Sequence, residues 1–218
     1  MMSPPAAQPA PASGVLADDL AGVLIARPRR PLASNDRARF DVGPHGPSRA
    51  AVAAVFRPAA PDTELLFIQR ATFDGDPWSG QMAFPGGRVE PTDPDSTATA
   101  ERETAEELDL DLGPARLLGD LAEVDGGQAT NRAVQVSGHC YWLEGPRPEL
   151  TPNYEVASAV WVPLTYLLDR GRYIEYWYGE AQTSFPGIQL DHPDQVIWGL
   201  TLRFLADLFR RLRRPFII

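Results

Sequence analysis

Three glutamates, Glu103, Glu106 and Glu107, stand close together in a segment that predicts a helix over residues 96–108. At about 100° per residue they fall within a wedge of roughly 100° on one helix face. The opposite face carries Ala98, Ala105 and Leu108. Like charges at these spacings repel by about 0.2–0.5 kcal/mol per pair on an exposed helix. We therefore expect a positive group beside them.

Two kinds of positive group are available for this cluster. Arg102 can neutralise one carboxylate, and the remaining carboxylate oxygens are hard ligands that suit Mg²⁺ or Mn²⁺. The alternative is a solvated acidic helix face without a ligand. The upstream sequence favours a site, because the turn Gly86-Gly87 lets bare backbone approach a ligand and Asp93 follows at a fixed distance.

The composition excludes several classes of enzyme. The chain has 218 residues, and all 20 of its basic residues are arginine. A Walker-type phosphate loop, a Schiff-base enzyme, a protein kinase and a Ser-x-x-Lys acylase each need a lysine. The net charge of −9 argues against broad nucleic-acid binding, which needs many cationic side chains. A phosphorylated small molecule remains compatible if metal ions supply positive charge.

The single cysteine, Cys140, cannot form an internal disulfide, so we expect a reducing cytoplasm. The longest candidate for a secretion signal contains two aspartates, and no apolar run reaches membrane-spanning length. We therefore expect a soluble, unexported protein that binds neither nucleic acid nor membrane.

Strands interleaved with a few helices indicate an α/β sandwich in which helices cover a mixed sheet. We expect a disordered Pro/Ala-rich leader over 1–13, an N-terminal helix and linker over 14–47, and one domain over 48–218. The predicted strands are 50–56, 64–70, 116–124, 132–143, 156–162 and 173–178. The predicted helices are 15–26, 96–108, 164–169 and 194–214.

The segment from Gly87 onward resembles the signature of the Nudix hydrolases. That signature is a glycine, five residues, a glutamate, seven residues and then Arg-Glu-U-x-Glu-Glu-x-Gly-U, with U apolar. The Arg-Glu-x-x-Glu-Glu core is intact here. Asp93 replaces the first glutamate, one extra residue precedes Arg102, Thr104 replaces an apolar residue and Asp109 replaces the last glycine.

The resemblance implies an α/β/α sandwich with a mixed sheet and metal-dependent hydrolysis of a diphosphate linkage. Glu103 and Glu107 would be the main Mg²⁺ or Mn²⁺ ligands, Glu106 would bind a further ion directly or through water, and the Gly87 carbonyl would add another ligand. Gly86 would serve the turn. The resemblance also allows a homodimer, with no surface patch assigned to it.

The remaining roles concern the loop and the attacking water. By resemblance, Arg102 pairs with Asp93 to hold the loop on the helix. A carboxylate must accept the proton of the water, and Glu106, Glu107 or Glu155 could do so. Family members often supply such a group from a loop before a late strand, which favours Glu155, although it is equally compatible with a plain strand-edge carboxylate.

Beyond the signature, most of residues 48–210 resembles the coenzyme A diphosphatase branch. The shared stretches are Gly80–Gly87, Glu90–Asp93, Glu155-Val156 with Val160–Leu164, and Trp198–Thr201. The branch has an arginine between Arg70-Ala71 and Gly80, and this chain has none there. Arg70 and Arg88 are candidate substitutes for phosphate binding.

The leading hypothesis is hydrolysis of coenzyme A or an acyl derivative to 3′,5′-ADP and phosphopantetheine. NADH, ADP-ribose and nucleoside triphosphates, including oxidised ones, are alternative substrates. A non-catalytic nucleotide-binding module and an acidic scaffold are alternatives from other classes. We expect structural or surface roles for the histidines and core packing for Cys140. The aromatic residues Trp78, Tyr154 and 176–178 could stack on a purine, although core packing is favoured. The arginines of 210–214 could contact a membrane or a partner, although favourable charge at a helix C-terminus is preferred.

Overall fold

The computed structural model describes residues 17–24, 48–76, 78–126, 133–179 and 181–216. The expected leader, 1–13, and most of the expected linker lie outside these residues, so the division of the chain at residue 48 stays a prediction. Within the described residues, every helix is too short or too polar to cross a bilayer.

The main sheet is mixed, as predicted. Its strands are β1 (Ser48–Ala59), β2 (Asp62–Arg70), β3 (Met82–Ala83), β4 (Gly86–Arg88), β5 (Arg116–Asp120), β6 (Val124–Gly126), β7 (Val134–Trp142) and β8 (Val156–Pro163). The central order is β3-β2-β1-β7-β5, and β4, β6 and β8 pair with β1, β7 and β2. β1 and β7 are parallel, while the other pairs are antiparallel.

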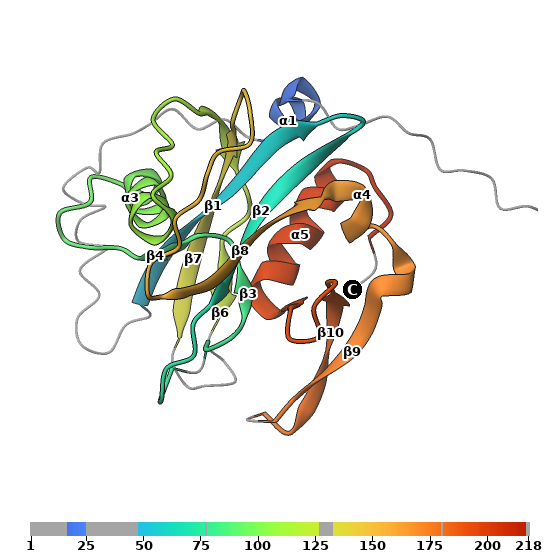
Figure 1. Ribbon diagram of the computed structural model, residues 1–218. Coiled ribbons are helices and arrows are strands. Elements are labelled where there is room, and N and C mark those ends of the chain that lie inside the picture. Colours follow the sequence, from blue (N-terminus) through green and yellow to red (C-terminus); the bar gives the residue numbers. More distant parts are fainter. Residues whose placement is uncertain (1–16, 25–47, 77, 127–132, 180, 217–218) are drawn as a thin grey trace, which may run out of the picture.

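Helices cover both faces of this sheet, which confirms the α/β/α sandwich (Figure 1). One face carries α3 (Ser96–Leu108), and the other carries α5 (Gly199–Arg211). The alternation of β1 explains the two layers, because successive side chains point to opposite faces. Ala51 and Ala53 pack in one core cluster with the α3 side, whereas Ala54 and Phe56 pack in the other cluster with the α5 side.

Smaller elements complete the fold. They are α1 (Ala17–Val23), α4 (Leu164–Leu167), the 3-10 turn η2 (Arg170–Arg172), and a second sheet of β9 (Tyr173–Tyr178), β10 (Thr183–Gln189) and β11 (Val196–Trp198). Leu20 and Leu24, at α1, are buried in the core cluster on the α5 side. The described part of the predicted helix 15–26 is therefore packed on the domain.

Several predicted boundaries were wrong. The helix predicted over 194–214 begins only at Gly199, because residues 196–198 pair with β10 and Gly199 has a positive φ of 59°. The strand predicted over 116–124 is divided into β5 and β6, with an irregular register between Leu117 and Gly119. The sequence interpretation also missed β3, β4 and β10.

Helix α3 has the predicted bounds but not the predicted inner face. Ala105 is exposed, while Thr104 is buried and its hydroxyl donates to the Ala100 carbonyl at 2.7 Å. That bond explains how a threonine replaces an apolar residue of the signature. Asp109 ends the helix in the left-handed region, with φ 54°. The glycine of the signature is suited to that conformation, which Asp also tolerates.

Candidate active site

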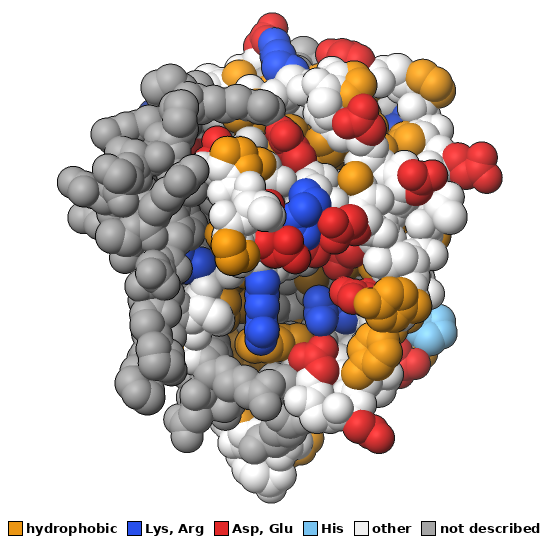
Figure 2. Space-filling model, turned by 90° about the vertical axis from the view of Figure 1, so that its left-hand side faces the viewer, with side chains coloured by type: hydrophobic (Ala, Val, Ile, Leu, Met, Phe, Trp, Pro, Cys, Tyr) orange, Lys and Arg blue, Asp and Glu red, His pale blue; other side chains and the backbone are white. Residues whose placement is uncertain are grey.

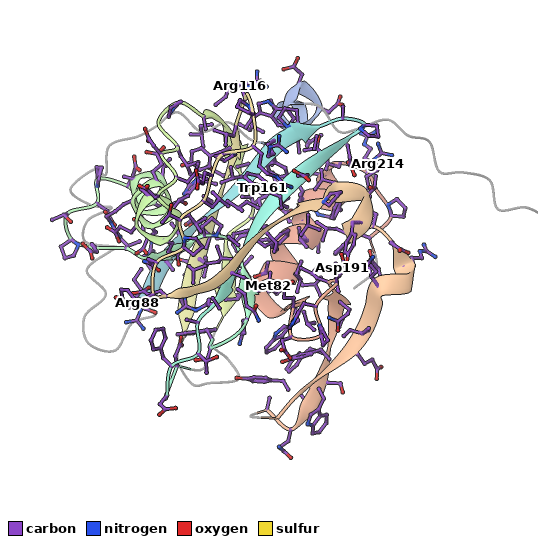
Figure 3. The ribbon with its side chains drawn as sticks, viewed as in Figure 1. Met82, Arg88, Arg116, Trp161, Asp191 and Arg214 are labelled. Atoms are coloured by element: carbon purple, nitrogen blue, oxygen red, sulfur yellow. The ribbon has the colours of Figure 1, made fainter. Side chains whose placement is uncertain are left out.

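The predicted site residues meet in one cleft of about 870 Å³. Figure 2 shows a hollow on this face, surrounded by arginine and acidic side chains. The charged part of its lining consists of Glu103, Glu106, Glu107, Arg70, Arg88, Arg102 and Glu155. The apolar part includes Val52, Val134, Met82, Phe84 and Phe204. Arg88 and Met82, which are labelled in Figure 3, belong to the charged and the apolar part, respectively.

The three helical glutamates differ in their exposure. Glu107 is 2% exposed, and one of its oxygens accepts a 2.9 Å hydrogen bond from the Gly86 amide. Glu103 is half-buried, and Glu106 is exposed. Glu107 therefore faces inward beside Ala100 and Leu108, rather than lying on a solvent face opposite the core.

Both glycines before the helix have close neighbours. A Cβ at Gly86 would lie 2.3 Å from the Ala51 carbonyl oxygen, so the backbone of β1 excludes a side chain there. A Cβ at Gly87 would lie 2.4 Å from the carboxyl carbon of Glu103 and would displace that carboxylate. The bare backbone of β4 therefore lies directly against the carboxylates of α3, and this contact explains why Gly86 and Gly87 stand at the cleft.

Arg102 organises the loop between β4 and α3. Its Nε and Nη2 each donate to a different oxygen of Asp93 at 3.1 Å, and Nη2 also donates to the Arg88 carbonyl. Asp93 is buried and also accepts from the Glu90 amide and the Thr99 hydroxyl. Burial opposes ionisation, but these bonds outweigh it and lower the pKa of Asp93. The pairing expected between Arg102 and Asp93 is present.

Arg102 also contacts two of the candidate metal ligands. Its Nη1 lies 3.1 Å from oxygens of both Glu103 and Glu106. Within the described parts of the chain, no three acidic, histidine or cysteine side chains already form a cluster arranged for a metal ion. Arg102 therefore competes with a cation for one oxygen of Glu103 and one of Glu106.

The carboxylates that remain are poorly neutralised. Burial, together with the charges of Glu103 and Glu155, raises the pKa of Glu107 to about 8, against the opposing Gly86 amide and Arg70. Burial also raises the pKa of Glu103, and the charges of Glu106 and Glu155 add to this effect. A concentration of carboxylate oxygens with surplus negative charge fits a hard divalent cation in kind.

Glu155 reaches this cluster from a different part of the chain. The loop before β8 is fixed to the end of α3, because the Thr151 and Asn153 amides donate to the carbonyls of Leu108 and Glu107 at 2.8 and 2.9 Å. The Glu155 carbonyl accepts from the Ala71 amide at 2.7 Å. The structure thus brings Glu155 into the same cleft as the helical glutamates.

The two arginines predicted to bind substrate both line the cleft. Arg70 ends β2, and its Nη2 donates to Asp76 at 3.1 Å. Its Nε is buried and has no hydrogen-bond partner among the described residues. Arg88 is exposed at the end of β4. The Arg70 side chain as a whole is 27% exposed, so the guanidinium groups of both arginines can offer N–H donors to an anion in the cleft.

Sequence reasoning missed two residues that build the site. Asp76 holds Arg70 and also accepts from the Trp78 amide at 3.1 Å. Asn153 accepts from the Glu155 amide at 2.8 Å and so shapes the loop that carries Glu155. The sequence did contain a signal for Asn153, because an asparagine side chain often accepts a hydrogen bond from the backbone amide two residues later.

Of the other residues considered from the sequence, Trp78 and Tyr154 also line the cleft, whereas the following ones lie elsewhere. Cys140 is fully buried in the core, and burial raises the pKa of its thiol. His139 is buried between Asp120 and Ser96, at 2.8 and 2.9 Å, while His192 lies apart from it on the surface and His45 is outside the described residues. In the 210–214 segment, Arg210 and Arg211 pair with Asp207 at the end of α5. Tyr176 and Tyr178 pack against Trp198.

Comparisons with known proteins agree with this architecture. The model of the NUDIX domain matches residues 47–178, more than half of the chain. A Nudix hydrolase named NudL from Yersinia pestis is 29% identical over 156 residues, which are 70% of this chain and 74% of that protein. A Schizosaccharomyces pombe protein, C14C4.10c, is 37% identical over 108 residues, 48% of this chain but only 33% of that longer protein.

A solved structure shows the same fold. The MutT/nudix family protein from Enterococcus faecalis superimposes with a TM-score of 0.55 at 16% identity, over 78% of this chain and 64% of that one. The fold, the glutamate helix and its glycine turn define a domain of the Nudix class. The chain belongs to the NUDIX domain family, and the prediction of a Nudix enzyme is confirmed.

Proposed function

We propose that the protein hydrolyses the diphosphate linkage of a nucleotide derivative, with coenzyme A or acyl-coenzyme A as the leading substrate. The products would be 3′,5′-ADP and phosphopantetheine. The observation that carries the proposal is the single cleft in which the glutamates of α3 and Glu155 lie beside Arg70 and Arg88. Such a site combines cation ligands with direct donors for phosphate oxygens.

The acidic side chains of the cleft lining are suited to hold Mg²⁺ or Mn²⁺. Glu103 and Glu107 would be the principal ligands, with Glu106 and the Gly87 carbonyl as further ones. A bound divalent cation neutralises diphosphate charge and lowers the pKa of a water. The close approach of the Glu103 carboxylate to Gly87 supports this set, because it places the backbone of Gly87 beside a candidate ligand.

The chain's own residues would bind and orient the diphosphate. The partly exposed guanidinium of Arg70 and the exposed guanidinium of Arg88 would supply the donors. Arg102 would keep the loop and helix together through Asp93. Glu155 is our first candidate to accept the proton of the attacking water, since it enters from its own loop; Glu106 and Glu107 are the alternatives.

Support for coenzyme A comes from the sequence stretches shared with that branch, and the absent upstream arginine counts against it. In the structure, Arg70 bonds to Asp76 within that interval. We also propose that the enzyme acts in the cytoplasm as a small-molecule hydrolase, in keeping with its single buried cysteine. A homodimer stays a prediction.

The test is a substrate panel with Mg²⁺ or Mn²⁺, analysed by chromatography and mass spectrometry. It contains coenzyme A, NADH, ADP-ribose and 8-oxo-dGTP. We expect metal-dependent release of 3′,5′-ADP from coenzyme A, and a loss of about 100-fold or more in kcat for Glu107→Gln or Glu155→Gln. Glu101→Gln, on the same helix but outside the cleft lining, is the matched control and should keep its activity.

Other outcomes separate the alternatives. Cleavage of another member of the panel would retain the chemistry and replace the substrate. Nucleotide binding without cleavage of any substrate would favour the non-catalytic module. Full activity of the Glu107→Gln variant would contradict the assignment of the metal site.

A further inference from the structure

Two exposed aromatic rings, those of Tyr154 and Phe73, lie side by side next to Glu155 at the cleft. Tyr154 is 77% exposed and Phe73 is 44% exposed. Their ring centroids are 6.4 Å apart, with an edge-to-face angle of 79°. Among the described residues, the only other large hydrophobic side chain so exposed is Trp177, on β9. Neighbouring exposed apolar groups of this kind often mark a binding surface.

Both rings are carried by loops that hydrogen bonds hold in place. The Phe73 amide donates to the Ser79 hydroxyl at 2.9 Å, and that hydroxyl donates back to the Phe73 carbonyl at 2.9 Å. Tyr154 lies between Asn153 and Glu155, whose backbones are bonded to Glu107 and Ala71. The pair is therefore preorganised rather than carried on a free chain.

The position of the pair relates it to the reacting groups. Tyr154 lines the cleft, and so do Asp74, Gly75 and Asp76, which directly follow Phe73. Tyr154 also precedes Glu155, whose charge acts on both Glu103 and Glu107. A planar group bound on the Tyr154 ring would thus be adjacent to a diphosphate held at the arginines and glutamates.

Resting on the proposed function, we propose that Tyr154, supported edge-on by Phe73, is the platform on which the base of the nucleotide substrate stacks. The two rings are too close in an edge-to-face arrangement to admit a base between them, so the base would lie on the open face of Tyr154. Stacking of a base on an aromatic ring tolerates different bases, because every base has a flat π-face. The cleft would then select for a nucleoside beside the diphosphate, rather than for a diphosphate alone.

Tyr154 has a second contact that must be separated from stacking. Its hydroxyl hydrogen-bonds to Glu155, and this bond raises the pKa of Tyr154. Removing the whole side chain therefore changes both the platform and a neighbour of Glu155. Tyr154→Phe keeps the ring and removes only the hydroxyl, so the two variants distinguish the roles.

The experiment measures binding of ADP and of inorganic diphosphate, with Mg²⁺, by titration calorimetry on the full chain. We expect Tyr154→Ala to weaken ADP binding roughly 5- to 100-fold, and to leave the Kd of inorganic diphosphate within about twofold. Tyr154→Phe should bind ADP as the unmodified protein does. Phe73→Ala should weaken ADP binding less than Tyr154→Ala does. Trp177→Ala, which removes the remote exposed ring, is the matched control and should change neither ligand.

The proposal is overturned if Tyr154→Ala binds ADP as tightly as the unmodified protein, if it loses affinity for both ligands equally, or if the unmodified protein does not bind ADP. Thermal unfolding of each variant shows that it is folded; the exposure of Tyr154 predicts little change in stability. Because binding is measured without turnover, failure of the proposed hydrolysis would appear separately, as intact substrate in the panel despite ADP binding.

Discussion

Each of the two covering helices buries one carboxylate, and the two carboxylates are treated in opposite ways. On α5, Asp207 is 9% exposed and accepts from the Ala122 amide at 2.9 Å and from Arg211 Nε at 2.8 Å, with Arg210 as a further donor. On α3, Glu107 is 2% exposed and accepts from the Gly86 amide, while its acidic neighbours Glu103 and Glu155 oppose its charge.

The pKa values follow from these surroundings. For Asp207 burial opposes ionisation, but the backbone bond and the two arginines outweigh it and lower the pKa. For Glu107 burial is reinforced by like charges, and the pKa rises to about 8. A buried acid with donors on every side stabilises the fold, whereas one left with surplus negative charge is available for a cation. The difference distinguishes a structural carboxylate from a site.

The largest stability effect should come from Asp207. We expect Asp207→Asn to lower the free energy of unfolding by about 1–3 kcal/mol, since it removes the charged acceptor of two arginines. Activity per folded molecule should change little, because Asp207 lies outside the cleft lining. Denaturant unfolding and steady-state kinetics measure the two quantities. Glu107→Gln should instead lose activity with little loss of stability. Equal losses of stability in both variants would contradict the distinction between a structural and a functional carboxylate.

The pH dependence of stability gives a second, smaller test on metal-free protein. The native pKa of Glu107 lies above its ordinary 4.5, so its contribution to stability is complete below pH 4.5 and declines as the pH rises toward about 8. Asp207 has a lowered pKa, so its contribution is present above its ordinary 3.8 and is lost as the pH falls further.

For Glu107 we expect a loss on the order of 1 kcal/mol between pH 5 and pH 8, because each pKa unit corresponds to about 1.4 kcal/mol and relaxation reduces the full shift. The free energy of unfolding of Glu107→Gln should depend less on pH over this range. Mg²⁺ should restore stability at pH 8 in the unmodified protein only. Unfolding measured in chelator and in Mg²⁺ provides the comparison. If stability falls with pH as steeply in Glu107→Gln as in the unmodified protein, another group causes the pH dependence.

The sequence predicted the glutamate cluster on α3, but neither the burial of Glu107 nor the pairing of Asp207 with arginines of α5. The spacing of Glu103, Glu106 and Glu107 placed them on one helix, and the bounds of α3 were correct. The inward turn of Glu107 was not predictable from alanines alone, because Thr104 and Ala100 rather than Ala105 face the sheet. Helical periodicity gives relative angles, while the packing partner decides which side is buried.

Long-range pairing limited the rest. β3 and β4 are two and three residues long, and they form because β2 and β1 offer backbone partners. β11 was assigned to a helix because Ile197 continues the apolar spacing of that helix, whereas its backbone pairs with β10. Contacts such as Arg70 with Asp76 depend on how a loop turns, and no local pattern in the sequence specifies that geometry.

The smallest stability effects are expected for the two arginines that bond to Asp207. Arg210 is 72% exposed and Arg211 is 15% exposed, although both bond to Asp207. Solvent screens the first contact, so Arg210→Gln should cost at most about 0.5 kcal/mol. Arg211→Gln should cost more, about 1 kcal/mol, because its bond is sheltered. Denaturant unfolding measures both losses. Equal losses in the two variants would mean that the number of donors bonded to Asp207 matters, and not how deeply each donor is buried. The contrast with Glu107 would then depend on the number of arginines that bond to each carboxylate. On α3, Arg102 bonds to Asp93, Glu103 and Glu106, whereas the hydrogen bond to Glu107 comes from the Gly86 amide.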